Sequence, residues 1–438
     1  MHHPGPPRFT SVGQTVELAP RRPDADDADA FSWTLTETPP ESTATLGSDA
    51  VEVFEPDEPG LYRARLSAPD GDYDQTVRVF PDERHPIEFT AHADELPQMD
   101  EISVTGRFND HRLGIDTPGY ADHVFSFETR LLPGEYTATF VPDGNFRAAA
   151  RDTQVVDGPE RPRITLDATA EDGTVTVTAT PLSGPTTDET AADLDVEFYV
   201  DDRDRPFEGL TVDGRTATAP LSAVDDQLRI HAVAVGKRHS VADAVTVGAD
   251  GSVDYHNDAP EWVEHGTMYE IFTRAFTGDA DATFRAIERR VPYLEWMGVD
   301  TLWMTPILDS YSPQRDLEGL KYGGPHGYDT LDYHRTAPDL GTREEFESLV
   351  ETCHDHGIKV VFDLVINHTS KRHPEFQMHE AGVDGYEDRY VRRENGKPEM
   401  YFSWSSIPNL DYTSLATREK MLGVVEEWAD VVDGFRCD

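Results

Sequence analysis

The chain has 438 residues, with 84 acidic residues against 38 Lys and Arg, and carries a formal charge of −46 at pH 7. This charge excludes the basic surface with which proteins bind nucleic acids, and no run of 18 or more apolar residues predicts a membrane span. Hydrophobic residues make up 37% of the sequence, which supports packed cores, and the length predicts about three domains.

The basic residues are mostly arginine, with 32 Arg and six Lys. A strongly acidic surface repels itself at low ionic strength, whereas salt at about 1 M shortens the screening length to about 3 Å. The composition therefore resembles that of proteins from salt-accumulating archaea, and an acidic protein of a low-salt cell is the alternative. Two cysteines are too few for a disulfide framework. Met1–Gly13 lacks the apolar core of a secretion signal, which favours a cytoplasmic protein.

The first 258 residues contain short alternating strands separated by Pro, Gly and Asp, a pattern that predicts all-β sandwich modules. The clearest strands are Leu61–Leu66, Gly173–Thr180 and Gln227–Val235. We expect the module boundaries at 1–85, 86–157 and 158–258.

Two segments of the second module carry a recognisable motif pair: Gly106-Arg107-Phe108-Asn109, and a hairpin from Pro133 to Gly144 with the pattern P-G-x-Y-x-x-x-F-x-x-D-G. The pair resembles the family 48 carbohydrate-binding module. In that family a sugar-stacking Trp usually stands where this chain has His111. Glucan binding by this module and a purely structural role therefore remain as alternatives.

From residue 259 onwards the pattern changes to strands that alternate with helices, which predicts βαβ units and a parallel sheet. Thr342 and Glu345 have the spacing of a capping box and begin a helix whose apolar face includes Cys353. We expect one earlier helix from Phe284 to Gly298 and a last helix near 416–429. Strands are expected at 268–273, 301–307, 359–366 and 434–438.

Polar side chains follow the predicted carboxyl ends of these strands, where the active sites of β/α barrels lie. Arg436 and Asp438 share one face of the fourth strand, so the guanidinium would orient the carboxylate. An ordinary ion pair at a strand end is the alternative. Asp363, Asn367 and His368 end the third strand, where a histidine is often only a structural residue.

Tyr328, in the segment His326-Gly327-Tyr328-Asp329, would either stack on a sugar or anchor a loop. Taken together, Asp363-x-x-x-Asn367-His368 and Gly434-Phe435-Arg436-x-Asp438 resemble the first two signatures of glycoside hydrolase family 13, the α-amylase family. The resemblance implies the first half of a (β/α)8 TIM barrel at 259–438. Further segments that resemble the family are 268–276, 301–307, 326–333 and 407–411, and an inserted wall of the cleft is expected at about 369–415.

The same resemblance implies roles for single residues. Asp438 would be the nucleophile and Arg436 would orient it. His368, Tyr328 and His326 would contact the substrate. Asp363 and Asn367 would support the site.

The resemblance also implies one metal ligand. Asn367 matches a position that often binds a structural calcium ion, although a second ligand of that site is usually Asp where this chain has Asn409. Cys437 is expected to point away from the site and Cys353 to lie in the core. No cofactor is expected for the chemistry itself, so Ca²⁺ would serve only as a structural ion.

Retaining glycoside hydrolysis needs a second carboxyl group about 5 Å from the nucleophile. In the family this is a Glu at the end of the fifth strand, beyond the four strands predicted here. We therefore expect a partial record of a longer enzyme that acts with retention on α-1,4-glucans or maltodextrins, itself inactive. The alternative is a non-catalytic glucan-binding or interaction module built on half a barrel.

Overall fold

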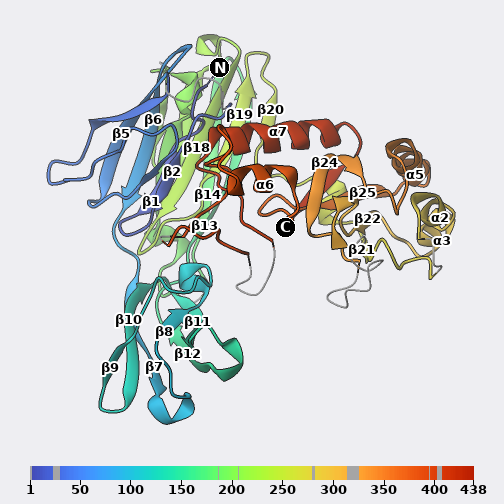
Figure 1. Ribbon diagram of the computed structural model, residues 1–438. Helices are drawn as coiled ribbons and strands as arrows, with labels where there is room; N and C mark the ends of the chain where they lie inside the picture. The colour runs from blue at the N-terminus through green and yellow to red at the C-terminus, as the bar shows by residue number, and fades with distance from the viewer. Residues whose placement is uncertain are drawn as a thin grey trace. The chain divides into compact units, whose positions relative to one another are not determined.

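The computed structural model describes residues 2–22, 30–185, 187–205, 207–278, 282–312, 325–393, 395–401 and 407–438. The chain forms two compact units, of which the first ends at Asp258 and the second begins at Ala259 (Figure 1). The first unit consists of β-sheets. The second unit alternates strands with helices.

The first sheets of the N-terminal unit lie within residues 8–80. A four-stranded sheet has the order β1-β6-β5-β3, in which β1 runs parallel to β6, and a two-stranded sheet joins β2 to β4. Tyr62 is fully buried in β5, and its hydroxyl donates to the Glu58 carbonyl at 2.9 Å. The strands are β1 (Arg8–Ser11), β2 (Val16–Leu18), β3 (Ser32–Glu37), β4 (Glu52–Phe54), β5 (Gly60–Ala68) and β6 (Gly71–Phe80).

The next pair of sheets has the orders β7-β10-β9 and β12-β11-β8. Phe89 from the first sheet and Phe140 from the second are fully buried in one shared apolar cluster. The two sheets therefore pack as a sandwich. The strands are β7 (His85–His92), β8 (Ile102–Thr105), β9 (Gly119–Ala121), β10 (Val124–Leu131), β11 (Gly134–Pro142) and β12 (Ala150–Val156).

The last pair of sheets in this unit has the orders β13-β14-β17-β16 and β15-β18-β19-β20. Val177 of the first sheet and Ile230 of the second are fully buried in one apolar cluster, so this pair also forms a sandwich. The strands are β13 (Arg163–Glu171), β14 (Thr174–Leu182), β15 (Asp195–Val200), β16 (Thr211–Asp213), β17 (Thr216–Pro220), β18 (Gln227–Val235), β19 (Asp243–Gly248) and β20 (Val253–Tyr255).

Two buried carboxylates link the sheets of residues 8–80, and the segment directly after them, to the last sandwich of this unit. Glu83 accepts hydrogen bonds from Nε of Arg238 at 3.1 Å and from the backbone and ring nitrogens of His239 at 2.8 and 2.7 Å. In the opposite direction, Asp202 accepts from the backbone N–H and the hydroxyl of Thr76, both at 2.7 Å. Each carboxylate exchanges water for several internal donors, which is the arrangement that permits burial of a charge.

The C-terminal unit contains a parallel sheet in the order β21-β22-β25-β26, as the alternating pattern predicts. Helices lie between its strands, and α2, α3 and α5 lie together along one part of it (Figure 1). The strands of the sheet are β21 (Met268–Ile271), β22 (Thr301–Met304), β25 (Lys359–Leu364) and β26 (Gly434–Cys437). The helices are α1 (Glu261–Glu264), α2 (Phe284–Glu288), α3 (Val291–Trp296), α5 (Arg343–Asp355), α6 (Pro374–Glu380) and α7 (Leu415–Ala429).

Local sequence signals explain where these helices begin and end. The capping box that begins α5 is present, with Thr342 and Glu345 bonded to each other's backbone, and Cys353 lies on the buried face. The single helix expected from Phe284 to Gly298 is wrong, because the structure contains two short helices. Pro292 in the first turn of α3 has no N–H to continue the hydrogen bonding of α2.

The sequence pattern did not predict the antiparallel pair β23 (Leu308–Ser310) and β24 (Thr330–Thr336), which stands outside the parallel sheet. The sheet strands are also shorter than expected, since β22 ends at Met304 and β25 at Leu364. The residues that follow β25 leave the sheet and include Asn367 and His368, which are described below.

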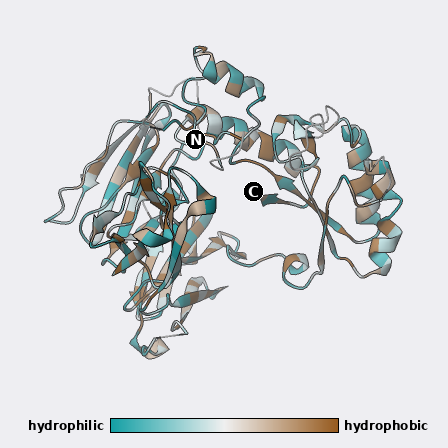
Figure 2. Ribbon diagram, turned by 60° about the horizontal axis from the view of Figure 1, so that its bottom comes forward, coloured by the Kyte–Doolittle hydropathy of each residue, from teal (hydrophilic) through white to brown (hydrophobic). Residues whose placement is uncertain are grey.

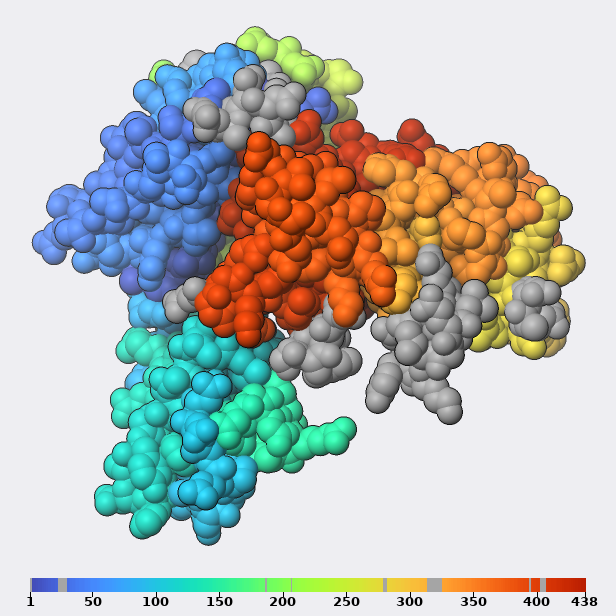
Figure 3. Space-filling model, in the orientation of Figure 1, coloured from blue at the N-terminus to red at the C-terminus, as the bar shows by residue number. Residues whose placement is uncertain are grey.

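The apolar core of the C-terminal unit lies between the sheet and its helices. Phe362 of β25 and Trp428 of α7 are fully buried, with ring centroids 5.7 Å apart, and Phe346 of α5 joins them. Brown hydrophobic segments mark the strands and the inner faces of the helices in Figure 2. Residues that follow β25, including α6, form an orange to red lobe in Figure 3.

Candidate active site

Side chains from neighbouring strands meet at the carboxyl end of the parallel sheet. Asp363 of β25 is the register partner of Arg436 of β26, and Trp303 lies on β22, the strand on the other side of β25. The structure thus brings Asp363 and Arg436 together, residues that are 73 positions apart in the sequence.

Asp363 is the centre of this cluster and is only 1% exposed. Its Oδ1 accepts from Nε1 of Trp303 at 2.8 Å, and its Oδ2 accepts from the hydroxyl of Tyr328 at 2.5 Å. Nε of Arg436 lies 3.6 Å from Oδ1. Burial raises the pKa of Asp363, and the hydrogen bonds from Tyr328 and Trp303 only partly offset that rise.

Arg436 also pairs with Asp438 through Nη1, as the alternation along the strand predicts. Its guanidinium lies over the ring of Trp303, 5.7 Å from the centroid, where the electron-rich face attracts a cation. The hydrogen bond to Asp438 raises the pKa of Arg436. One fixed guanidinium therefore sets the positions of two carboxylates.

His368 and Tyr328 lie beside this cluster. Nε2 of His368 is 2.8 Å from the carbonyl of Tyr328, so this nitrogen carries the hydrogen. Nδ1 is buried and has no hydrogen-bond partner among the described residues. Burial lowers the pKa of His368, which keeps the ring neutral at pH 7. The ring of His326 stacks on Tyr328 at 6.0 Å, and its Nδ1 accepts from the Tyr328 backbone N–H at 3.0 Å.

Asn367 follows β25, and its side-chain oxygen, unlike the oxygens of Asp363, accepts no hydrogen bond from the described residues. Oδ1 of Asn367 and Oδ1 of Asn409 are both buried without a hydrogen-bond partner among the described residues. The two residues lie on paired segments, because Leu410 donates its N–H to the Asn367 carbonyl at 3.0 Å and His368 bridges to Asn409. Amide oxygens are ligands that Ca²⁺ accepts, so these two side chains offer two of the about six to eight oxygen ligands that a structural calcium ion takes.

Two aromatic residues near the site were not assigned a role from the sequence. Trp303 bonds Asp363 and lies beneath Arg436, and Tyr401 lies 4.9 Å from His368, ring to ring, while remaining 43% exposed. The position of Trp303 one residue before the end of β22 was a usable signal. Tyr401 had none, because it is a single residue of a long connection. The inserted wall at about 369–415 includes Tyr401, and its residues 394 and 402–406 are outside the described residues.

The two cysteines take the places expected for them. Cys353 is buried in α5, and burial raises the pKa of its thiol to about 12. Cys437 is exposed and lies between Arg436 and Asp438 on the opposite face of β26. Since only a thiolate is a strong nucleophile, Cys353 has no chemical role at neutral pH.

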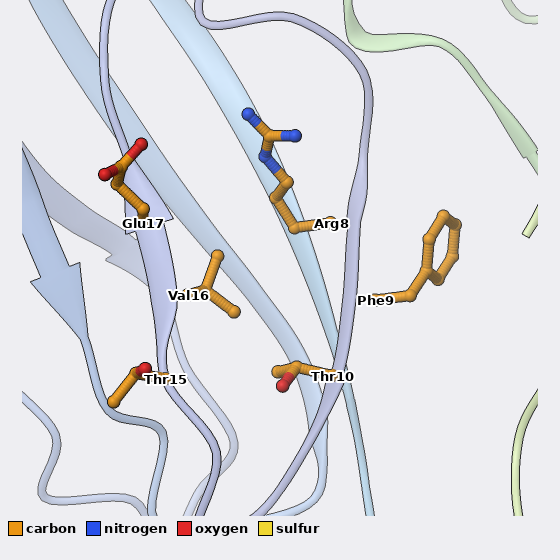
Figure 4. Close-up of a pocket in the computed structure, with 6 residues that line it drawn as sticks. All are labelled: Arg8, Phe9, Thr10, Thr15, Val16 and Glu17. Atoms are coloured by element: carbon orange, nitrogen blue, oxygen red, sulfur yellow. The ribbon is translucent and has the colours of Figure 1, made fainter. Parts of the chain in front are cut away.

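Two pockets lie in the N-terminal unit, and their lining residues are not among the candidate site residues of the C-terminal unit. A pocket of about 310 Å³ lies between β1 and β2. Figure 4 shows Arg8 and Glu17 extending toward the same side of it, while Phe9 points away. A second pocket, of about 480 Å³, is formed by β7 and β10. Neither contains a residue that the sequence analysis assigned to the site.

The described residues contain neither a membrane-spanning helix nor a cluster of metal-ligating side chains. No described helix has the length and apolar character needed to cross a membrane. Within the same described ranges, no three His, Cys, Asp or Glu residues form a group that would hold a metal ion.

Comparison with known proteins supports a family assignment for the C-terminal unit. Residues 270–438 match the model of the alpha-amylase catalytic domain. The whole chain is 40% identical to alpha-amylase MalA of Haloarcula japonica, in an alignment covering 100% of this chain and 62% of that protein. It is 32% identical to trehalose synthase/amylase TreS of Mycobacterium tuberculosis, over 46% of this chain and 39% of that protein.

A solved structure is also similar to part of the chain. The alpha-amylase from H. orenii is 33% identical over 40% of each chain, with a TM-score of 0.34. The C-terminal unit therefore carries an α-amylase-family catalytic-domain sequence, and by homology the chain is related to the glycosidases of that family. The chain spans 62% and 39% of the two curated relatives named above. The match to a protein of Haloarcula japonica agrees with the resemblance of the acid-rich composition to proteins from salt-accumulating archaea.

Proposed function

We propose that the protein is a retaining glycoside hydrolase that cleaves α-1,4-glucosidic bonds in α-glucans or maltodextrins. The observation that carries the proposal is the Arg436–Asp438 pair at the end of β26, in a unit whose sequence matches the alpha-amylase catalytic domain. The relative from Haloarcula japonica, which is named as an alpha-amylase, supports the same substrate class.

In this mechanism Asp438 is the nucleophile. Its carboxylate attacks the anomeric carbon while the glycosidic C–O bond breaks, and a general acid protonates the departing oxygen. Water, deprotonated by the same group, then releases the sugar from Asp438 with retained configuration. Arg436 holds the carboxylate in one orientation. Capture of the covalent intermediate by a sugar hydroxyl would give transglycosylation instead.

Asp363 is a poor general acid despite its raised pKa. Both of its oxygens already accept hydrogen bonds inside the protein, from Trp303 and Tyr328, and the side chain is closed to solvent. A proton donor must reach the departing oxygen directly or through one water. Among the described residues, no other carboxyl group contacts the Arg436–Asp438 pair, so we propose that a polypeptide of these 438 residues alone is inactive.

The residues around the pair supply the substrate contacts in this proposal. We assign His368, Tyr328 and His326 to the sugar on the glycone side of the cleaved bond. The exposed ring of Tyr401, 4.9 Å from the His368 ring, supports this assignment. Aromatic faces bind the C–H face of a pyranose by the same apolar contact that stacks them on one another.

We further propose a structural calcium ion held by the side-chain oxygens of Asn367 and Asn409, which are buried without partners among the described residues. The ion would supply no chemistry, and would join the end of β25 to the segment around Asn409. Chelation by EDTA is then expected to lower Tm in the natural protein and less so in Asn367→Ala; an unchanged Tm in both would contradict the proposal.

The half-barrel, the carbohydrate-binding role of residues 86–157 and the cytoplasmic location stay predictions. For the second module, the exposed ring of Tyr120, 57% exposed and 4.6 Å from the ring of Phe125, supports glucan binding. His111, where the related modules usually have Trp, is exposed and has a φ of 57°.

The test uses the complete protein as its gene encodes it, called the natural protein here and below, and not a polypeptide of these 438 residues alone. It compares the natural protein with Asp438→Asn and with Cys437→Ser, all assayed on maltodextrin in high salt. We expect Asp438→Asn to lose at least about 10³-fold in kcat, as removal of a nucleophile does, and Cys437→Ser to retain full activity because its side chain is on the other face. Equal activity of Asp438→Asn and the natural protein would remove Asp438 from its role. A natural protein that binds maltodextrin without cleaving it would instead favour the non-catalytic binding module.

A further inference from the structure

A buried arginine contacts the segment that carries the proposed sugar-binding side chains. Arg274 follows β21, and its side chain is only 4% exposed. Its Nε donates to Oδ2 of Asp339 at 2.8 Å, and its Nη1 donates to the carbonyl oxygen of Pro306 at 2.8 Å. Pro306 follows β22 and Asp339 follows β24. One guanidinium therefore joins the chain after three different strands.

The backbone that carries Arg274 is itself fixed. The N–H of Thr273 donates to Oγ1 of Thr305 at 3.0 Å, and the hydroxyl of Thr273 donates to the Thr305 carbonyl at 2.9 Å. Both threonines are buried. These bonds continue the pairing of β21 with β22 beyond the last register pair of the two strands, so the arginine side chain starts from a fixed position.

The guanidinium also makes a close contact with Gly327. A methyl group on the Cα atom of Gly327 would lie 2.6 Å from Nη1 of Arg274 and 3.0 Å from the carbonyl oxygen of Pro306. The φ of Gly327 is +86°, a backbone conformation that glycine adopts far more readily than other residues. His326 and Tyr328, which we assign to the sugar, flank this glycine directly. The guanidinium therefore supports the chain at the point between the two rings.

A structural ion pair alone does not account for this arrangement. A buried charge is costly unless its hydrogen-bonding groups are used, and Nη2 of Arg274 is buried with no hydrogen-bond partner among the described residues. The carboxylate partner, Asp339, is 40% exposed, so solvent weakens the pair. An apolar side chain would fill the same space without an unused donor. It would lack the planar fork that bonds two segments and supports a third.

We propose that Arg274 is a positioning residue for substrate binding, because it supports Gly327 and thereby places the rings of His326 and Tyr328 against the sugar. This inference rests on the proposed α-glucan substrate. Arg274 itself does not contact the sugar, since its side chain is closed to solvent. Its effect passes through the segment 326–328, so it changes binding affinity and diminishes when the ring of Tyr328 is absent.

Other contacts of the segment limit the size of the effect. The hydroxyl of Tyr328 donates to Asp363, and the N–H of Gly327 donates to Oγ of Ser312 at 2.9 Å. Both contacts survive the loss of Arg274. The segment is therefore expected to shift rather than to detach, which weakens binding without abolishing it.

The test is a double-mutant cycle on binding. Calorimetry measures the Kd of maltotetraose in high salt for the natural protein carrying Asp438→Asn, which prevents cleavage. Arg274→Lys keeps the charge but loses the planar fork, and we expect it to raise Kd about tenfold. In the presence of Tyr328→Ala, we expect the same change to raise Kd by less than about threefold, because coupled residues have non-additive effects. Arg285→Lys, which alters a 69% exposed arginine–glutamate pair, is the matched control and should leave Kd unchanged.

An equal rise of Kd with and without the Tyr328 ring would overturn the positioning role. An unchanged Kd in Arg274→Lys would overturn it too, even with a lower Tm, because a purely structural residue alters stability and not the affinity of the folded protein. If Arg274→Lys does not fold, Gly327→Ala replaces it, with the same two expected changes of Kd, because the added methyl group displaces the glycine from the guanidinium. Normal binding that is insensitive to both changes leaves the proposed function intact, whereas a parent that binds no maltotetraose overturns the proposed substrate as well.

Discussion

Nε of Arg436 lies 3.6 Å from Oδ1 of Asp363, and the same guanidinium pairs with Asp438 through Nη1. Asp363 is itself fixed by donors from two other segments, the indole of Trp303 and the hydroxyl of Tyr328. The orientation of Asp438 therefore depends on side chains that never touch it.

Replacing Arg436 by Lys tests this geometry. Lysine keeps the charge but lacks the rigid planar fork that places Nε near Asp363 and Nη1 on Asp438, and it has no flat group to lie over Trp303. We expect kcat of the natural protein to fall about 10- to 100-fold, with a smaller change in KM, because positioning rather than binding is lost. Steady-state kinetics on maltodextrin measure both constants. A rise in KM with an unchanged kcat would contradict the positioning role.

Replacing Tyr328 by Phe removes the hydroxyl that donates to Oδ2 of Asp363. A buried carboxylate oxygen then loses a donor, which costs about 1–2 kcal/mol of unfolding free energy. Urea unfolding followed by tryptophan fluorescence measures this change. The control is Tyr269→Phe, since Tyr269 is 37% exposed on β21. Equal stability of the two variants would contradict the prediction, because it would mean that a water molecule donates to Oδ2 of Asp363 in place of the Tyr328 hydroxyl.

Glu83 gives the N-terminal unit a defined acid sensitivity. Burial alone would raise the pKa of Glu83, but hydrogen bonds from His239 and Arg238 outweigh burial and lower it. A carboxyl with a lower pKa in the native state stabilises the fold above its unfolded pKa, and that stability is lost as the pH falls below it. We expect the unfolding free energy of the natural protein to fall as the pH drops below about 4.5, near the ordinary pKa of Glu.

Glu83→Gln is expected to lower stability by about 2–3 kcal/mol at pH 7, because Arg238 and His239 lose a buried charged partner. Its stability should also fall less as the pH drops from about 5 to about 3, the range in which the natural protein loses the contribution of Glu83. Urea unfolding at pH 7 and across this acid range, at constant high salt, measures both effects, with Glu95→Gln as the exposed control. Parallel pH profiles for Glu83→Gln and the natural protein would contradict the assignment.

The charge of −46 predicts that stability depends on salt. Self-repulsion acts over about 10 Å at 0.1 M ionic strength and about 3 Å at 1 M. We expect Tm to rise by roughly 10 °C between 0.1 M and 3 M KCl, equivalent to about 3 kcal/mol for a domain of this size. Thermal unfolding by circular dichroism in this series is the measurement, and full stability in dilute buffer would favour the low-salt alternative.

Much of the C-terminal unit followed from local patterns. The strand positions, the capping box of Thr342 and Glu345, and the shared face of Arg436 and Asp438 depend on neighbours within a few residues. The division into α2 and α3 was missed, although Pro292 was visible, because the apolar spacing continues across the break. The strand β23 was missed because its three residues are too few for a strand pattern. Most of β24 was assigned only by its resemblance to the family, in the segment 326–333, and not as a strand.

The sequence by itself determined the residue types at the strand ends, the alternation of strands and helices, and the acid-rich surface, since these depend on composition and on spacing along the chain. Only the tertiary structure decided that Asp363 gathers Trp303, Tyr328 and Arg436, residues that lie 35 to 73 positions away. Spacing cannot supply such contacts, because parallel strands are brought into register by the packing of helices that lie between them.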